Sequence, residues 1–212
     1  MANVDLRTYA FLDSMQPQLA SQVAATAKGF LPVVWQAALY VEIAPGIEIN
    51  RLTDVAIKST SVQPGLQVVE RAFGLLEIHH EDQGQVLEAG RAILDNLELT
   101  VSDRLKPRIV TSETIKDIHD YHSQLINRTS RSANLLLPGD MLYILEVHPA
   151  GYAAFAANEA EKAARIKIVE VRGVGAFGRV YFCGDEAEVE VGRDAVHRGL
   201  EALDGRPNEP RS

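Results

Sequence analysis

Two short stretches of the chain carry the residues best suited to chemistry. VVERAFGLL spans residues 68–76 and RGVGAFGRV spans residues 172–180, and both contain the triplet AFG. In the first stretch the triplet follows Glu70 and Arg71, a carboxylate and a guanidinium that can form a bidentate, charge-assisted pair. In the second stretch the same positions hold Val174 and Gly175, which are uncharged. The chain therefore repeats one triplet with different chemistry in front of it.

Enzymatic signatures are missing from the sequence. GVGAFG is glycine-rich like a phosphate-binding loop, but it lies between two predicted strands and lacks the helix N-terminus that completes an anion site. The chain has no GxGxxG after a strand, no P-loop, no HExxH and no nucleophile elbow. We therefore predict no catalytic residue and no enzymatic activity.

Two histidine clusters contain potential metal ligands. HHED occupies residues 79–82, and His119 and His122 are three residues apart. Neither cluster has a third ligand at a characteristic spacing, so we interpret both as solvated surface. No metal and no cofactor are expected.

Composition and charge exclude several classes of partner. The 212 residues include 21 Lys and Arg against 29 Asp and Glu, a net charge of −8, and there is no basic block of the kind that binds nucleic acid or anionic membranes. No apolar run approaches the roughly 18 residues of a membrane span. Cys183 is the single cysteine, which favours a reducing compartment, and we interpret it as a small buried residue. The simplest location is the cytoplasm.

The repeated triplet belongs to a longer internal duplication. When the sequence is shifted by 104 positions, identical residues align without a gap: Glu42/Glu146, Pro45/Pro149, Ala56/Ala160, Lys58/Lys162, and Ala72, Phe73 and Gly74 with Ala176, Phe177 and Gly178. LEAGR at 87–91 matches VEVGR at 189–193 at an offset of 102. This order predicts two domains, residues 1–104 and 105–205, followed by a disordered tail at 206–212.

Each copy shows the same rhythm of predicted elements. In the second copy, strands are predicted at 141–147, 167–171 and 178–182 and helices at 152–166 and 185–203. The first copy repeats the pattern around residues 39–43 and 83–97, and segments 6–30 and 108–136 add a strand and a helix to each. The predicted fold is an α/β sandwich of the α+β kind, with helices covering a small mixed sheet.

Residues 145–190 and their echo at 41–78 resemble the bacterial microcompartment (BMC) shell domain in its tandem form. The motifs LRTYAFLDSMQPQLA, PGIEINR, VERAFG, LINR and AANEAEKAA resemble, more narrowly, the circularly permuted tandem shell proteins of carboxysomes. The resemblance covers residues 5–205. It implies two permuted, ferredoxin-like BMC domains per chain and three chains per flat, pseudohexameric tile.

In this family the loop between the second and third core strands lines a central pore. The resemblance therefore places Ala72, Phe73 and Gly74 with Ala176, Phe177 and Gly178 in the pore loops, and Glu70, Arg71, Val174 and Gly175 at the gate. Arginine and glutamate from neighbouring copies could pair across the opening or rotate away, because an exposed pair contributes only about 0–1 kcal/mol. Members with an iron-sulfur cluster carry a cysteine in this loop, which this chain lacks.

Lys58 and Lys162 match the lysine that packs at the tile edge in this family. The resemblance further implies a homotrimer, a stack of two such trimers, contacts with other shell proteins (hexamers and pentamers), and small metabolites crossing a gated pore. The expected location is a microcompartment shell in the bacterial cytoplasm. The alternative is a trimeric regulatory protein or weak enzyme on the same fold, which would bind a small molecule through Glu70, Arg71 and nearby histidines.

Overall fold

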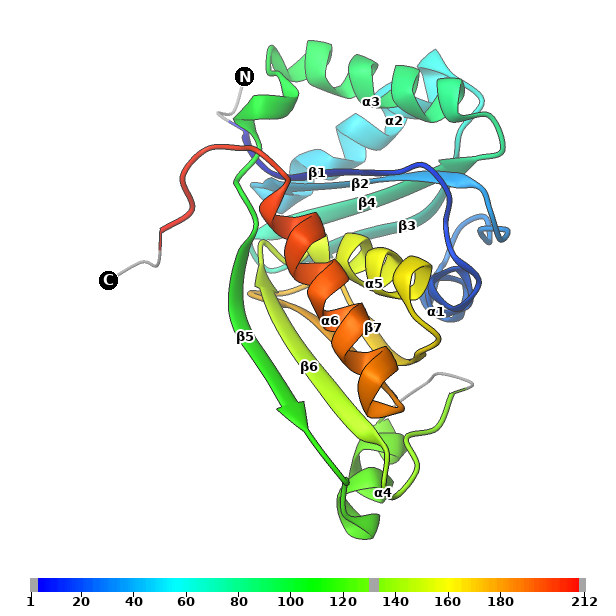
Figure 1. The fold of residues 1–212 in the computed structure, drawn as a ribbon. Helices are drawn as coiled ribbons and strands as arrows, with labels where there is room; N and C mark the ends of the chain where they lie inside the picture. The colour runs from blue at the N-terminus through cyan, green and yellow to red at the C-terminus, as the bar shows by residue number, and fades with distance from the viewer. Residues whose placement is uncertain (1–3, 130–133, 210–212) are drawn as a thin grey trace.

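The computed structural model describes residues 4–129 and 134–209, which form two four-stranded sheets with helices packed against them (Figure 1). The strand orders are β1-β2-β4-β3 and β5-β6-β8-β7, so the second sheet repeats the first. The strands of the first sheet are β1 (Asp5–Leu12), β2 (Ala37–Ala44), β3 (Gln63–Glu70) and β4 (Phe73–His80). Those of the second are β5 (Arg108–Ile115), β6 (Met141–His148), β7 (Lys167–Arg172) and β8 (Gly178–Gly184).

Both sheets are antiparallel throughout, whereas we expected a mixed sheet. The strands before and after α2 (Ile49–Ser59) do run in the same direction, as a strand-helix-strand unit requires. However, β4 inserts between them and pairs with both. The same insertion of β8 separates β6 from β7.

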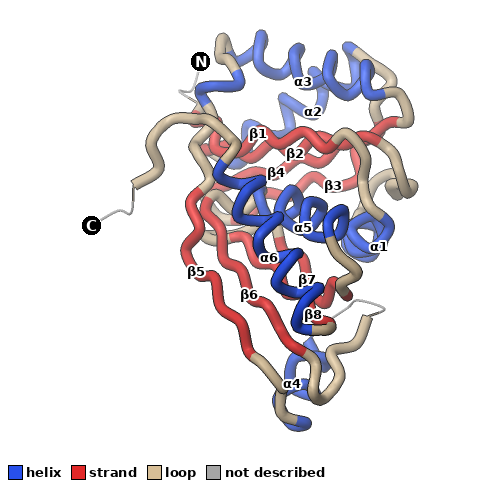
Figure 2. Tube along the Cα trace, viewed as in Figure 1, coloured by secondary structure: helices blue, strands red, loops and turns tan. Residues whose placement is uncertain are grey.

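Pairs of long helices pack against the sheets (Figure 2). α2 and α3 (Gln83–Leu97) lie on the outer face of the first sheet, and α5 (Tyr152–Ala163) and α6 (Glu186–Glu201) cover a face of the second sheet, where α5 also contacts β1 of the first. α5 is rich in alanine because it packs closely against α6 and against strands of both sheets, and its buried small residues include Ala153, Ala156, Ala157 and Ala160. The α/β architecture predicted from the sequence is confirmed, and α3 has the predicted bounds.

α1 (Pro17–Thr26) belongs to the first half in sequence but packs on the second half. Its buried Leu19, Ala20 and Val23 join a core made mostly of β6, α5, β8 and α6 residues. The Glu161 carboxylate of α5 accepts hydrogen bonds from the backbone N–H groups of Gln18 and Leu19, at 2.8 and 3.0 Å. Glu161 thus caps the first turn of α1 across the junction between the halves.

α4 (Asp120–Thr129) is the second copy's equivalent of α1, and its surroundings are different. It lies at the lower end of the molecule in Figure 1, far from the first sheet. Tyr121 and Leu125 leave 73% and 60% of their surface exposed. The chain therefore covers α1 and leaves the matching surface of α4 open.

The segment after α6 returns to the junction between the halves. Leu105 and Arg206 form an isolated bridge, the Arg206 guanidinium pairs with Asp5, and the Asn208 amide donates to the carbonyls of Lys106 and His148. This differs from the expected disorder of the tail at 206–212, because these polar contacts anchor its first residues. Residues 210–212 lie outside the described part of the chain.

Candidate functional site

The first of the two repeated loops is a tight hairpin turn. β3 ends at Glu70, β4 begins at Phe73, and Arg71 and Ala72 make the turn. Arg71 adopts a φ of 54°, in the left-handed region that a non-glycine residue enters at a cost of roughly 1 kcal/mol. Glu70 and Arg71 are both exposed, and neither has an ion-pair partner among the described residues. The turn thus presents two charged side chains at the tip of the hairpin.

The second loop is wider. β7 ends at Arg172 and β8 begins at Gly178, so residues 173–177 connect them. Gly175 has a φ of 106° and matches Arg71 in the first copy, so both loops need a left-handed residue at the same point. Phe177 is partly exposed, and its ring lies edge-on to the His148 ring with centroids 6.1 Å apart.

The structure brings the two loops of one chain together. Glu70, Val174 and Gly175 line one small cavity with Phe73. A Cβ placed on Gly175 would lie 3.7 Å from Glu70 Oε1, so the carboxylate lies directly against the second loop. Three of the four predicted gate residues are therefore neighbours, and Arg71 lies at the adjacent turn.

The glycine of each AFG triplet has a packing role. A Cβ on Gly74 would come within 2.3 Å of the Gly46 carbonyl, and a Cβ on Gly178 within 2.3 Å of the Ala150 carbonyl. The backbone of each loop thus approaches the turn after β2 or β6 too closely for any side chain. Gly46 N–H also donates to the carbonyl of Ala72 at 2.8 Å. The triplet is repeated in part because both copies need this approach.

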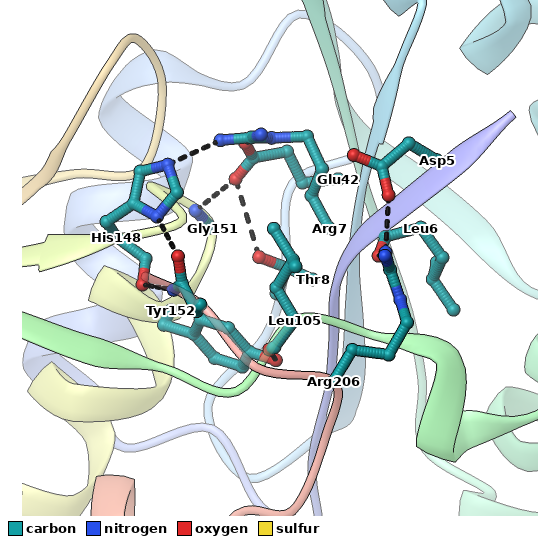
Figure 3. A network of polar contacts seen from close by, with 11 residues as sticks. Asp5, Leu6, Arg7, Thr8, Glu42, Leu105, His148, Gly151, Tyr152 and Arg206 are labelled. Atoms are coloured by element: carbon teal, nitrogen blue, oxygen red, sulfur yellow. Dashed lines mark hydrogen bonds and ion pairs between the residues drawn. The ribbon is translucent and has the colours of Figure 1, made fainter. Parts of the chain in front are cut away.

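A buried ion pair between Arg7 and Glu42 lies next to Phe73 of the first loop, and Figure 3 shows the polar contacts of this pair. Arg7 Nε donates to Glu42 Oε1 at 2.8 Å, and both side chains are at least 95% buried. The guanidinium also lies 3.8 Å from the centroid of the Phe73 ring, a cation-π contact. Burial raises the pKa of Glu42, and the adjacent guanidinium of Arg7 partly opposes this rise. The phenylalanine of the first triplet therefore packs on a charge pair in the core.

The same ion pair connects the two halves. Glu42 Oε2 accepts the Gly151 N–H at 2.6 Å, and Arg7 Nη2 lies 3.1 Å from His148 Nε2. Since a guanidinium can only donate, His148 Nε2 accepts, and His148 Nδ1 carries the hydrogen toward Asn208 Oδ1 at 2.8 Å. Phe73 and Phe177 of the two triplets thus both contact this network. Sequence reasoning missed Arg7 and His148; the aligned Glu42 and Glu146 were the one available signal.

The two predicted edge lysines have different surroundings. Lys58 on α2 pairs with Asp54 at 2.6 Å and its side chain is 74% exposed. Lys162 on α5 pairs with Asp13 at 2.5 Å, and this contact lowers the pKa of the Asp13 carboxyl. Lys58 is therefore the more exposed of the two lysines, and Lys162 reaches across the junction of the halves to Asp13.

The prediction of a solvated surface at residues 79–82 is wrong for His79. Its side chain is fully buried, with Nδ1 2.9 Å from Glu77 Oε1. His79 alternates with the buried Ile78 along β4 and faces the side of the sheet that α1 covers. The rest of the segment performs local roles, since Asp82 caps α3 through the Gly84 N–H.

Cys183 and His119, two further residues that the sequence singled out, each make contacts with nearby parts of the chain. Cys183 is buried as predicted, and burial raises the pKa of its thiol to about 12. His119 stacks on Tyr121 and accepts that residue's backbone N–H through Nδ1 at 3.2 Å. Within residues 4–129 and 134–209, no group of three or more potential ligands is arranged to hold a metal ion. No helix in that part of the chain is both long and apolar enough to cross a bilayer.

Comparison with known proteins relates this chain to shell proteins. A family model described as the CsoS1D N-terminal domain matches residues 6–103. The carboxysome shell protein CcmP of Synechococcus elongatus is 51% identical over 203 residues, covering 96% of this chain and 95% of CcmP. The carboxysome shell protein CsoS1D of Hydrogenovibrio crunogenus is 47% identical over 200 residues, covering 94% of this chain and 98% of that protein.

Two solved structures have the same fold over nearly the whole chain. The fused permuted hexameric shell protein MSM0275 from the RMM microcompartment has a TM-score of 0.92 at 44% identity, covering 95% of this chain and 99% of its own. The double-ringed trimeric shell protein MSM0271 from the same kind of microcompartment has a TM-score of 0.93 at 39% identity, covering 97% and 100%.

Proposed function

Because the chain belongs to the family of carboxysome shell proteins that includes CcmP and CsoS1D, we propose that three copies close into a flat, pseudohexameric tile with a gated central pore. The chain is a structural component of a bacterial microcompartment shell, and the shell is where it is located, as the sequence motifs indicated. What we propose beyond this is the pore, its gate and the passage of metabolites. The tile performs no chemistry of its own.

One observation carries the proposal: loops 70–74 and 174–178 lie side by side within one chain. The two halves are two copies of one fold, so the pair of loops is one third of a ring with approximate six-fold symmetry. A three-fold axis beside the loops would bring six of them around one opening. Residues 1–104 and 105–205 then each supply one domain of the tile.

Glu70 and Arg71 form the gate in this proposal. Three such pairs alternate around the axis with three Val174-Gly175 pairs, whose small size leaves room for the long side chains. Arg71 pairs with Glu70 of a neighbouring copy in the closed state and turns away in the open state. Both states are accessible because an exposed ion pair contributes only about 0–1 kcal/mol. The pore passes small polar metabolites.

The edges of the tile complete its role in a shell. We assign Lys58 and Lys162 to these edges, where their alkyl stems cover apolar surface of the next tile. Neighbouring tiles are other shell proteins, both hexamers and pentamers. The relative MSM0271 is double-ringed, and we extend a stack of two trimers to this chain.

Light scattering and averaged electron microscopy images test the tile and the gate together. We expect a mass of three or six copies and a central opening that is wider in the E70A/R71A double variant than in the wild type. The matched control is R91A/D95A, which removes an exposed Arg-Asp pair on α3 and leaves the opening unchanged. A monomer without a pore contradicts the tile, and an identical opening in wild type and E70A/R71A contradicts the gate.

The same images test the edges. At high concentration the wild type should form sheets or tubes, and K58D/K162D should remain as separate trimers. Sheets formed by this double variant would show that the lysines do not lie at the edge.

A further inference from the structure

The contact that α1 makes within the chain can be compared with the surroundings of α4, its equivalent in the second copy. The chain enters the two helices in the same way: Trp35 N–H donates to the Met15 carbonyl just before α1, and Gly139 N–H donates to the Ile118 carbonyl just before α4. This match aligns the helices at an offset of 103. Tyr121 therefore corresponds to Gln18, and Leu125 to Gln22.

The positions that meet the other half are polar in α1. Gln18 and Gln22 face the edge of β7, where the Gln18 side chain donates to the Ile166 carbonyl at 2.9 Å and accepts from the Ile168 N–H at 2.8 Å. The first turn is capped by Glu161 of α5. The contact within the chain is thus a polar one at its rim.

On the surfaces of α4 and α2 that the chain leaves exposed, the equivalent positions are apolar. Tyr121 and Leu125 are exposed on α4, and Ile57, which matches Glu161 at the offset of 104, is 44% exposed on α2. A polar pair in one copy therefore corresponds to two apolar residues that lie on separate, uncovered surfaces of the chain. Exposed apolar groups on matched surfaces indicate a partner that brings them together.

α4 also does not need a partner's carboxylate at its first turn. The Tyr121 N–H, which corresponds to the Gln18 N–H, already donates to His119 Nδ1. At the position that matches the capping Glu161, α2 has Ile57, which cannot accept a hydrogen bond from a helix N-terminus. His119 supplies a cap to α4 from within its own segment instead, so the Tyr121 N–H still has a partner. The two substitutions are consistent with a contact in which α4 meets α2.

We propose that α4 of one copy docks on α2 and the β3 edge of the next copy, with Tyr121 on Ile57 and Leu125 beside Val62 and Pro64. This contact rests on the proposed trimer, because three such contacts close the ring. It repeats the geometry of α1 on α5 and β7, with an apolar rim in place of a polar one. The partner surface is thus a second copy of this chain.

A second repeated contact supports the same docking. Glu42 accepts the Thr8 hydroxyl and the Gly151 N–H, and the matching Glu146 accepts the Thr111 hydroxyl at 3.1 Å. The residue that matches Gly151 is Ile47, which is 65% exposed. Docking in the same geometry brings the Ile47 N–H of the next copy to Glu146.

Paired charge substitutions test this contact. We expect I57E and Y121K, each alone, to reduce the mass in solution from three or six copies to one, because each places a charge on an apolar surface. The double variant I57E/Y121K should restore the assembly, since the new charges then face each other across each contact. L87E on α3 is the control and should leave the mass unchanged, because Leu87 is 49% exposed and lies outside the α2 and β3 surface of the proposed contact.

The outcomes separate this contact from the proposed tile. Both positions are exposed in the single chain, so each variant should retain the wild-type circular dichroism spectrum. A wild type that is already a monomer overturns the tile and this contact together. A wild-type trimer whose single variants stay trimeric, or whose double variant stays monomeric, overturns the contact and leaves the tile in place.

Discussion

At the bulge of the outermost strand, the first half of the chain has Arg7 and the second half has Val110. Both residues interrupt the pairing register at the same place, between Leu6 and Thr8 in β1 and between Ile109 and Thr111 in β5. Arg7 turns inward to a buried carboxylate that contacts the other half, whereas Glu146 lacks an arginine at this position. Duplication therefore preserved the backbone and left the side chain free to differ where the surroundings differ.

The inner faces of the sheets differ in the same way. Glu77 and His79 of β4 form a fully buried pair, and the matching residues of β8 are Tyr181 and Cys183. The first pair lies on the side of its sheet that α1 covers, and in the second copy Cys183 is buried and Tyr181 is half-buried. At these matched positions the first half buries two titratable polar groups where the second half has an aromatic ring and a thiol.

Breaking the arginine network should have the largest effect. Arg7→Met leaves the Glu42 carboxylate buried without its counter-ion, so we expect the free energy of unfolding to fall by about 3–5 kcal/mol. Val110→Met, at the same bulge of the second copy, should cost about 1 kcal/mol or less. Urea denaturation measures both, and equal losses would show that the two bulges do not differ in role.

The pH dependence of the stability of a Glu77 variant should test the difference between the inner faces of the two sheets. Burial raises the pKa of Glu77, so its contribution to stability is complete below its ordinary value and is lost as pH rises through the raised value. Glu77→Gln removes this titration. Its stability relative to the wild type should therefore increase as the pH rises above the ordinary glutamate pKa of about 4, by about 1.4 kcal/mol for each unit by which the folded-state pKa is raised.

The matched control is Tyr181→Phe, at the equivalent position of the second copy. This change removes no carboxyl group, so its stability difference from the wild type should be the same across the pH range. A Glu77→Gln difference that is flat with pH would show that Glu77 titrates alike in the folded and unfolded chain.

The smallest effects are expected at the two turns. Gly175→Ala places a side chain at a φ of 106° and should cost about 1 kcal/mol, whereas Arg71→Gly relieves a left-handed arginine and should gain up to about 1 kcal/mol. Thermal unfolding detects both. The comparison fails if Arg71→Gly is the more destabilising change of the two.

Much of the fold could be predicted because it depends on local pattern. Alternation in strands, the alanine-rich stretch at 152–166 and the offset of 104 identified the elements and their duplication. The prediction of a mixed sheet was wrong because the order in which the strands pair depends on where β4 inserts. No local sequence pattern encodes that position.

Less of the site could be predicted. The loops were found because they are repeated, but Arg7 and His148 are 141 residues apart and meet only through the packing of the halves. His79 was misassigned because two adjacent histidines suggest a wet surface, whereas strand alternation carries His79 to the same side as Glu77. The glycine of each triplet was assigned to a pore loop, and the close approach to Gly46 or Ala150 could not be foreseen.

The position of α1 on the second half has a consequence for biosynthesis. A ribosome releases α1 long before α5 and α6, yet Leu19, Ala20 and Val23 lie in a core made mostly of those later elements. During translation this helix therefore exposes an apolar face that its own half covers only in part, which is the kind of surface that nascent-chain chaperones bind. The order of synthesis is thus opposed to the order of packing in this duplicated chain.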